Sequence, residues 1–227
     1  IYVQRYLADG SSVGSRIEAG ASLDDDDATL VALGGGAFAL AWAGKGAGRD
    51  ESVYVQRFDA EGQEAGDRLK LDGRTDLNLS DSAPSVAALG DTGNLAVAYA
   101  GWVPREENSF SENAVIVQAF KQAEGELEAI KPRVVFRDTA TQPQVEAVGS
   151  SGDFVLAWIA RELDEGTNMR DGTVFLQRFN SSGVTLGDPV KLETPGNPTG
   201  NESGFQMAVL DNRVAVAFES QNSSSSA

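Results

Sequence analysis

The stretch Tyr54-Val55-Gln56-Arg57-Phe58 decides the fold, because the chain repeats it. Equivalent phrases stand at Tyr2-Val3-Gln4-Arg5-Tyr6, Ile116-Val117-Gln118-Ala119-Phe120 and Phe175-Leu176-Gln177-Arg178-Phe179. A second phrase, two apolar runs around a tight turn, also occurs four times. Its copies run from Leu30 to Trp42, Val86 to Tyr99, Val145 to Trp158 and Met207 to Phe218. A period of about 57 residues, a quarter of the 227-residue chain, indicates a repeat architecture.

Each phrase is typical of antiparallel strands joined by a turn. Turns such as Gly90-Asp91-Thr92-Gly93-Asn94 contain the residue types that adopt positive φ. The apolar runs around Ala98 and Ala157 predict strands buried on both faces, whereas the alternation in 67–71 predicts an outer strand with one wet face. We label the strands of a repeat A to D from the axis outward, with Ser85–Leu89 as an A strand. Four strands per repeat are typical of a propeller blade.

The sequence therefore predicts an all-β fold, a four-bladed β-propeller with four antiparallel strands per blade and almost no helix. The chain begins on a C strand and ends on a B strand, so we expect the ring to be closed by the N- and C-terminal hairpins. Residues 204–219 would then pair with residues 1–20. One propeller over 1–220 is expected, with repeats at about 1–51, 52–113, 114–172 and 173–220 and a Ser-rich tail or linker at 221–227. A fragment of a larger propeller is the alternative.

Composition excludes several kinds of chemistry. The chain has no cysteine and no histidine, which excludes disulfides, thiolate or imidazole metal sites and catalysis by Ser-His-Asp or Cys-His groups. Its 34 acidic and 18 basic residues give a net charge of −16, so we expect no nucleic-acid partner. No apolar run approaches the roughly 18 residues of a membrane helix, and we expect no direct membrane insertion.

The repeat resembles a known family. The segment from Pro84 to Leu89, Gly93, Leu95 to Tyr99 and the Val55–Gly62 phrase with Gly66 are similar to the propeller-like repeats of large secreted bacterial haemolysin-type calcium-binding and type I-secreted adhesin proteins. The resemblance implies an extracytoplasmic location, secreted, on the cell surface or periplasmic, and a calcium-rich setting. The glycine- and aspartate-rich nonapeptide that binds calcium in that group is absent here.

Acidic residues gather in the B–C loops and D–A connections, which should emerge on one face. Asp24, Asp25, Asp26 and Asp27 form the densest group and are the candidate metal ligands, because calcium prefers carboxylate oxygens. A solvated charge run is the alternative. Calcium is the only cofactor expected, and no organic cofactor is expected.

Two long loops, 101–113 and 160–172, are the candidate docking surface for a protein partner. Trp102 would supply an apolar anchor outside the repeat pattern, within an acidic rim. The remaining candidates of this surface are charged: Arg105, Glu106, Glu107, Glu162, Asp164 and Glu165.

The repeated aromatic residues and glutamines are interpreted as structural. Trp42, Tyr99, Trp158 and Phe218 should pack as core, and Gln4, Gln56, Gln118 and Gln177 should bond strands or blades together. The function expected is a non-catalytic extracytoplasmic interaction or scaffold module, adhesive or accessory, that binds a protein partner through the acidic loops. The alternative is a carbohydrate-binding or glycosidase propeller with a sugar ligand.

Overall fold

The fold is built from β-strands. The computed structural model describes residues 1–20, 25–45, 51–71, 81–104, 111–131, 133–137, 139–163, 170–193 and 201–221. These residues form strands β1 to β17, all in antiparallel sheets, and one short 3-10 turn, η1 (Gly34–Gly36). None of the described segments is a helix long and apolar enough to span a membrane. The all-β, antiparallel prediction is confirmed.

Three sheets contain the complete set of A to D strands in the predicted order. The first is β3 (Asp26–Ala32), β4 (Phe38–Lys45), β5 (Glu51–Phe58) and β6 (Leu69–Leu71). The second is β7 (Ser82–Leu89), β8 (Asn94–Pro104), β9 (Ser111–Ala123) and β10 (Glu126–Ala129), with β11 (Val134–Phe136) also on β9. The third is β12 (Thr141–Val148), β13 (Asp153–Leu163), β14 (Arg170–Phe179) and β15 (Thr185–Leu192).

Two hairpins flank these sheets. β1 (Tyr2–Tyr6) pairs with β2 (Ser12–Glu18), and β16 (Asn201–Leu210) pairs with β17 (Arg213–Gln221). The first hairpin packs Ile1, Val3 and Ile17 against the β4–β5 face, and the second packs against the β13–β14 face. β17 extends to Gln221, one residue into the segment expected to be a tail, and 222–227 lie outside the described residues.

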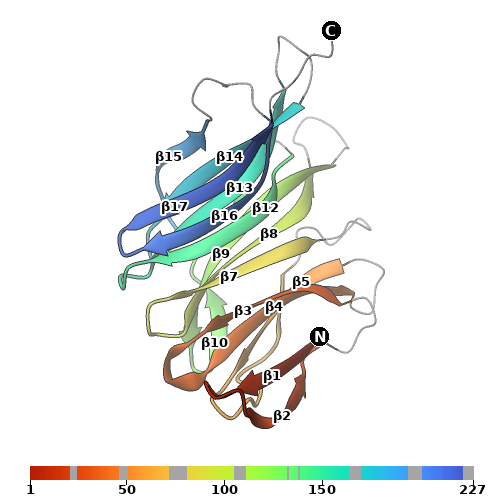
Figure 1. Cartoon of the computed structure of the whole chain (residues 1–227), viewed down its shortest axis with the longest axis vertical. Helices are drawn as coiled ribbons and strands as arrows, with labels where there is room; N and C mark the ends of the chain where they lie inside the picture. The colour runs from red at the N-terminus through yellow and green to blue at the C-terminus, as the bar shows by residue number, and fades with distance from the viewer. Residues whose placement is uncertain are drawn as a thin grey trace.

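The predicted closure of the ring is wrong for this structure. Among the described strands, β1–β2 and β16–β17 are separate two-stranded sheets that do not pair with each other. Figure 1 shows the reason: the sheets follow one another along the long axis, so the red N-terminal hairpin and the dark blue C-terminal hairpin lie toward opposite ends. Local strand patterns specify the partners within a sheet, but they do not set the angle between sheets.

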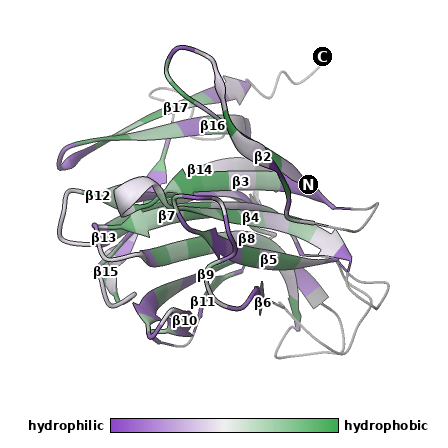
Figure 2. Cartoon of the chain, turned by 90° about the horizontal axis from the view of Figure 1, so that it is seen from below, coloured by the Kyte–Doolittle hydropathy of each residue, from purple (hydrophilic) through white to green (hydrophobic). Residues whose placement is uncertain are grey.

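The core lies in the middle strands of the sheets. The B strands β4, β8 and β13 are buried on both faces, as their continuous apolar runs predict. Trp42, Tyr99 and Trp158 are 1%, 2% and 3% exposed, which confirms that these three aromatic residues are core, whereas Phe218 is only half-buried. Figure 2 shows apolar residues on the central strands and hydrophilic residues at many of the turns.

Candidate functional site

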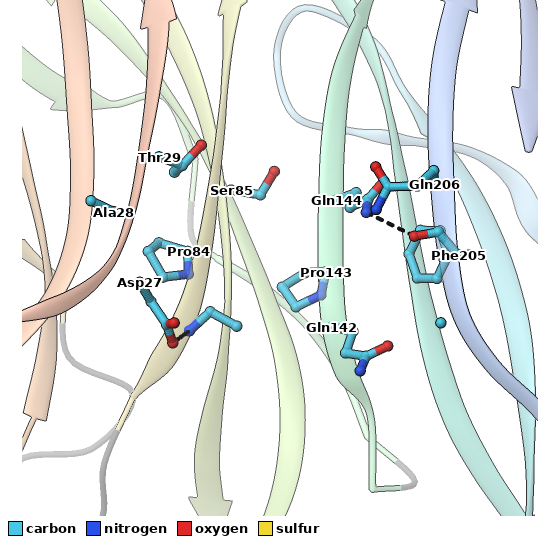
Figure 3. A pocket seen from close by; sticks show the side chains of 12 residues that line it. Asp27, Ala28, Thr29, Pro84, Ser85, Gln142, Pro143, Gln144, Phe205 and Gln206 are labelled. Carbon is cyan, nitrogen blue, oxygen red and sulfur yellow. Dashed lines mark hydrogen bonds between the residues drawn. The ribbon is translucent and has the colours of Figure 1, made fainter. Parts of the chain in front are cut away.

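A groove of about 530 Å³ runs across the inner strands of the molecule (Figure 3). The four A strands β3, β7, β12 and β16 each contribute three consecutive residues, at equivalent positions of the repeat. These segments are 27–29, 83–85, 142–144 and 204–206. The groove is therefore a product of the repeat, because the same part of each blade faces it.

The first residue of each segment has a left-handed backbone. Asp27, Ala83, Gln142 and Gly204 have φ of 48°, 49°, 52° and 70°. Each strand carries a register shift at this place, typical of a β-bulge. Positive φ is unfavourable for residues other than glycine, and such strain is concentrated at functional sites. The bulge recurs in all four A strands and places three non-glycine residues at positive φ around one groove, which makes this groove the candidate site.

The second position of each segment forms an apolar floor. Pro84, Pro143 and Phe205 are buried there, and Ala28 takes the position on β3. The third position carries Thr29, Ser85, Gln144 and Gln206, which supply hydroxyl and amide groups. Two further polar side chains, Asp27 and Gln142, are exposed at the first position, as is Gln206 at the third. The described lining contains one carboxylate and no lysine or arginine.

Side chains of the groove also hold neighbouring sheets together. The Ala83 N–H donates to Asp27 Oδ2 at 3.2 Å, and the Val145 N–H donates to Ser85 Oγ at 3.0 Å. Gln144 makes two such bonds, donating from Nε2 to the Phe205 carbonyl at 3.1 Å and accepting from the Met207 N–H at 3.0 Å. Each junction between adjacent A strands is therefore fixed by a side chain of the groove, which makes its polar groups preorganised.

Further carboxylates precede the bulges in three of the four repeats. Asp81 and Glu202 are 3% and 4% exposed, and Asp25 takes the same position on the first blade. The Asp25 carboxylate fills the space beside Gly20 and Gly44, so neither position has room for a Cβ atom. Ser220 Oγ donates to Glu202 Oε1 at 3.4 Å.

Glu146 lies two residues beyond Gln144 on β12 and therefore points to the same side of that strand. Desolvation raises the pKa of Glu146. Glu146 is exposed and lies outside the groove lining, so it is a candidate proton donor only for a ligand that extends beyond Gln144.

The candidate metal ligands are only partly brought together. Asp26 and Asp27 are exposed at the start of β3, Asp25 precedes them, and Asp24 lies outside the described residues. Desolvation and the like charges of Asp27, Glu51 and Asp25 raise the pKa of Asp26. No group of three or more acidic residues within the described ranges is arranged to hold a metal ion. Calcium binding stays a prediction.

The candidate docking surface lies largely beyond what the structure describes. Arg105, Glu106, Glu107, Asp164 and Glu165 are outside the described residues, and only the backbone of Glu162 is described, in β13. Trp102 was expected in a loop, but it lies half-buried in β8 opposite Asn113. β8 and β9 extend beyond the repeat phrase, so residues 101–104 and 111–113 of the expected loop are paired strands.

The repeated glutamines have the structural role that was predicted. Gln56 Nε2 donates to the carbonyls of Arg57 at 3.0 Å and Gly66 at 3.1 Å, and Gln177 does the same to Arg178 at 2.8 Å and Gly187 at 3.1 Å. Gln56 bonds its C strand to the segment before β6, and Gln177 bonds its C strand to β15 itself. The groove glutamines Gln142, Gln144 and Gln206 were missed, because they do not belong to either repeated phrase.

Comparison with known proteins gives structural matches only. No protein-family model matches the sequence, and no curated protein is significantly similar to it. An endo-arabinase from Bacteroides thetaiotaomicron VPI-5482 has a TM-score of 0.47 and 11% identity, over 83% of this chain and 68% of that one. A complex of BT0996 with RGII has a TM-score of 0.44 and 15% identity, over 81% and 62%. A glycoside hydrolase has a TM-score of 0.42 and 14% identity, also over 81% and 62%.

These matches correct the expected function. A non-catalytic module that binds a protein partner was the main expectation, but two of the three similar structures are an endo-arabinase and a glycoside hydrolase. The same two structures count against the expectation that the chain is not an enzyme. At these identities and TM-scores the likeness says nothing about the chemistry of this chain, and the groove carries the evidence for a carbohydrate ligand.

Proposed function

We propose that the groove binds a neutral carbohydrate chain. The observation that supports this most is the composition of the lining. Amide and hydroxyl groups on four adjacent strands lie over the apolar residues Pro84, Pro143 and Phe205. Sugars present hydroxyls at their edges and C–H groups on their faces. Small-ligand sites combine mostly apolar lining with a few placed polar groups in the same way, at volumes of roughly 300–1,000 Å³.

The charges favour a neutral chain over an acidic one. Asp27 is exposed in the groove, and the described lining has no cationic side chain to balance a uronic acid or a sulfate. The whole chain carries −16, which repels polyanions at long range. A neutral polysaccharide brings no charge that the groove would have to balance and is not repelled by the net charge of the chain. Asp27 can accept hydrogen bonds from the hydroxyl groups of such a polysaccharide.

The proposal includes two expectations from the sequence. The chain supplies the strands of four propeller blades, three complete and one divided between the terminal hairpins. The location is extracytoplasmic, where polysaccharides are met. The repeated bulge, which aims the same three residues of each blade at one groove, supports the propeller arrangement.

Affinity electrophoresis through gels containing arabinan, galactan, xylan or polygalacturonate tests this proposal. We expect retardation by at least one neutral polysaccharide and none by polygalacturonate. Gln206→Ala and Asp27→Asn should each weaken binding by about two- to tenfold, as expected for one hydrogen bond of about 0.5–1.5 kcal/mol. Gln63→Ala, an exposed glutamine in the turn after β5, is the matched control and should bind normally. Equal retardation of all variants, or none by any neutral polysaccharide, would overturn the proposal.

Hydrolysis is the second candidate, favoured by the raised pKa of Glu146 beside a groove that holds Asp27. Glycosidases use one protonated and one ionised carboxyl group on opposite sides of the scissile bond. Release of reducing ends from the retained polysaccharide, lost in both Glu146→Gln and Asp27→Asn, would support an enzyme. Binding without release by the unmodified chain would restrict the function to recognition.

A further inference from the structure

We propose that the groove contains two polar subsites separated by β7, and that one carbohydrate chain crosses β7 to fill both. The first subsite is formed by Asp27 and Thr29 on β3, and the second by Gln142 on β12 and Gln206 on β16. This inference rests on the proposed function and deepens it, because it identifies the ligand as an oligosaccharide of several units rather than a single sugar.

The order of the A strands sets the length of the groove. They lie side by side in the order β3, β7, β12 and β16, and the side-chain hydrogen bonds described above join each strand to the next (Figure 3). Neighbouring strands are at least about 4.8 Å apart, and packed sheets are about 10 Å apart. Three such steps separate β3 from β16, so the lining extends over roughly 14–30 Å. A ligand that contacts both strands is therefore longer than one sugar ring.

Some polar side chains of the lining are already used by the fold. Ser85 Oγ accepts from the Val145 N–H at 3.0 Å. Gln144 uses both polar atoms of its amide, because Nε2 donates to the Phe205 carbonyl and Oε1 accepts from the Met207 N–H. These bonds hold Ser85 and Gln144 in contacts between sheets, so the other polar groups of the lining are the better candidates for a ligand.

The polar groups that remain lie on either side of β7. Gln142 and Gln206 are exposed, and neither makes a side-chain hydrogen bond within the described ranges. On β3, Asp27 Oδ2 accepts from the Ala83 N–H, while Oδ1 has no partner among the described residues. Figure 3 shows Asp27 and Thr29 on one side of the groove and the two glutamines on the other.

A mainly apolar step at β7 separates the subsites. The lining residues of β7 are Ala83, the buried Pro84 and Ser85, whose oxygen is already engaged. Pro143 follows on β12 and is buried too. The C–H face of a sugar unit can lie over these residues, whereas its hydroxyl groups find few partners there. A chain therefore gains most of its hydrogen bonds on β3 and on β12–β16, with a linking unit over β7.

The two subsites differ in their hydrogen-bonding chemistry. The carboxylate of Asp27 only accepts hydrogen bonds, whereas the amides of Gln142 and Gln206 both donate and accept. Hydroxyl groups are the donors of a neutral sugar, so the β3 subsite selects a unit with free hydroxyl groups. The glutamines can also donate to ring oxygens, glycosidic oxygens or acyl carbonyls. Each subsite thus recognises a different part of the ligand.

Calorimetric titration with oligosaccharides of increasing length tests this arrangement, using fragments of the neutral polysaccharide that retards the protein most. We expect the affinity to rise with length until the chain covers both subsites and then to stay constant. For long oligosaccharides, Asp27→Asn and Gln206→Ala should each weaken binding by about two- to tenfold. The double variant should lose the product of the two factors, because separate sites contribute additively to the free energy.

The shortest oligosaccharides should behave differently. They fill one subsite, so only one of the two substitutions should change their affinity. Gln142→Ala should follow Gln206→Ala at every length, because both glutamines belong to one subsite. Asp188→Asn, at an exposed carboxylate on the outer strand β15, and Gln63→Ala are the matched controls and should leave all affinities unchanged.

Two results would overturn the two subsites while leaving carbohydrate binding intact. One is an affinity that does not depend on chain length. The other is equal weakening of the shortest oligosaccharides by Asp27→Asn and Gln206→Ala in variants that circular dichroism shows to be folded. Absence of binding to every neutral polysaccharide would overturn the proposed function, and the two subsites with it.

Discussion

Replacing Gln144 tests how the blades are held together at the groove. Gln144→Ala removes two hydrogen bonds to β16, one donated to Phe205 and one accepted from Met207. At a net of about 0.5–1.5 kcal/mol each, the free energy of unfolding should fall by about 1–3 kcal/mol. Ser85→Ala removes a single bond, to Val145, and should cost about half as much.

Urea unfolding followed by tryptophan fluorescence measures these differences, since Trp42 and Trp158 are buried. The variant Gln144→Glu tests the same contact through the pH dependence of the free energy of unfolding. Its carboxylate can accept from Met207 but cannot donate to the Phe205 carbonyl, so its folded-state pKa should lie above the unfolded value of about 4.3. The penalty should be complete above the folded pKa and should fade as the pH falls through it. A Gln144→Ala protein within about 0.5 kcal/mol of the unmodified chain would refute the reasoning.

Three further predictions concern the blade junctions and the acidic end of β3. Gly66→Ala should lower the free energy of unfolding by about 1–3 kcal/mol in urea titrations, because φ is +81° there and a Cβ atom would meet the Gly125 carbonyl oxygen. Gly125→Ala, also at positive φ but facing open space, should cost less, and equal losses would contradict the contact. Asp26→Asn should raise Tm at pH 7, because the pKa of Asp26 is raised in the folded state and its charged form is therefore unfavourable there. Below the unfolded pKa of about 3.9 the carboxyl is protonated in both states, so the variant should have no effect on Tm. A lower Tm of the variant at pH 7 would contradict this. Calcium should raise Tm relative to a solution with chelator at matched ionic strength, and an unchanged Tm would contradict calcium binding to the folded chain.

The sequence predicted what the repeat determines locally. The Tyr-Val-Gln-Arg phrase and the apolar runs gave the order of the A to D strands, the buried B strands and the bonding role of Gln56 and Gln177. These features follow from side-chain alternation and turn chemistry, which act within one blade.

The sequence did not predict the groove or the arrangement of the sheets, because both depend on contacts between neighbouring sheets. The bulge at Asp27, Ala83 and Gln142 has no glycine to mark its positive φ, so the groove was not visible in the sequence. The closure of the ring could not be predicted because it depends on how neighbouring sheets meet, and these contacts join β3 to β7, β7 to β12 and β12 to β16. Trp102 was expected in a loop because it lies beyond the repeated phrase, but β8 and β9 continue to pair past that phrase, as β13 and β14 do.

Amide chemical-shift mapping with neutral oligosaccharides is the most direct test of the central claim, that the groove formed by the four A strands binds carbohydrate. Titration of labelled protein with arabino- and galacto-oligosaccharides should shift resonances of 27–29, 83–85, 142–144 and 204–206 together, with one dissociation constant. Saturable shifts confined to other surfaces, with these four segments unmoved, would contradict the account.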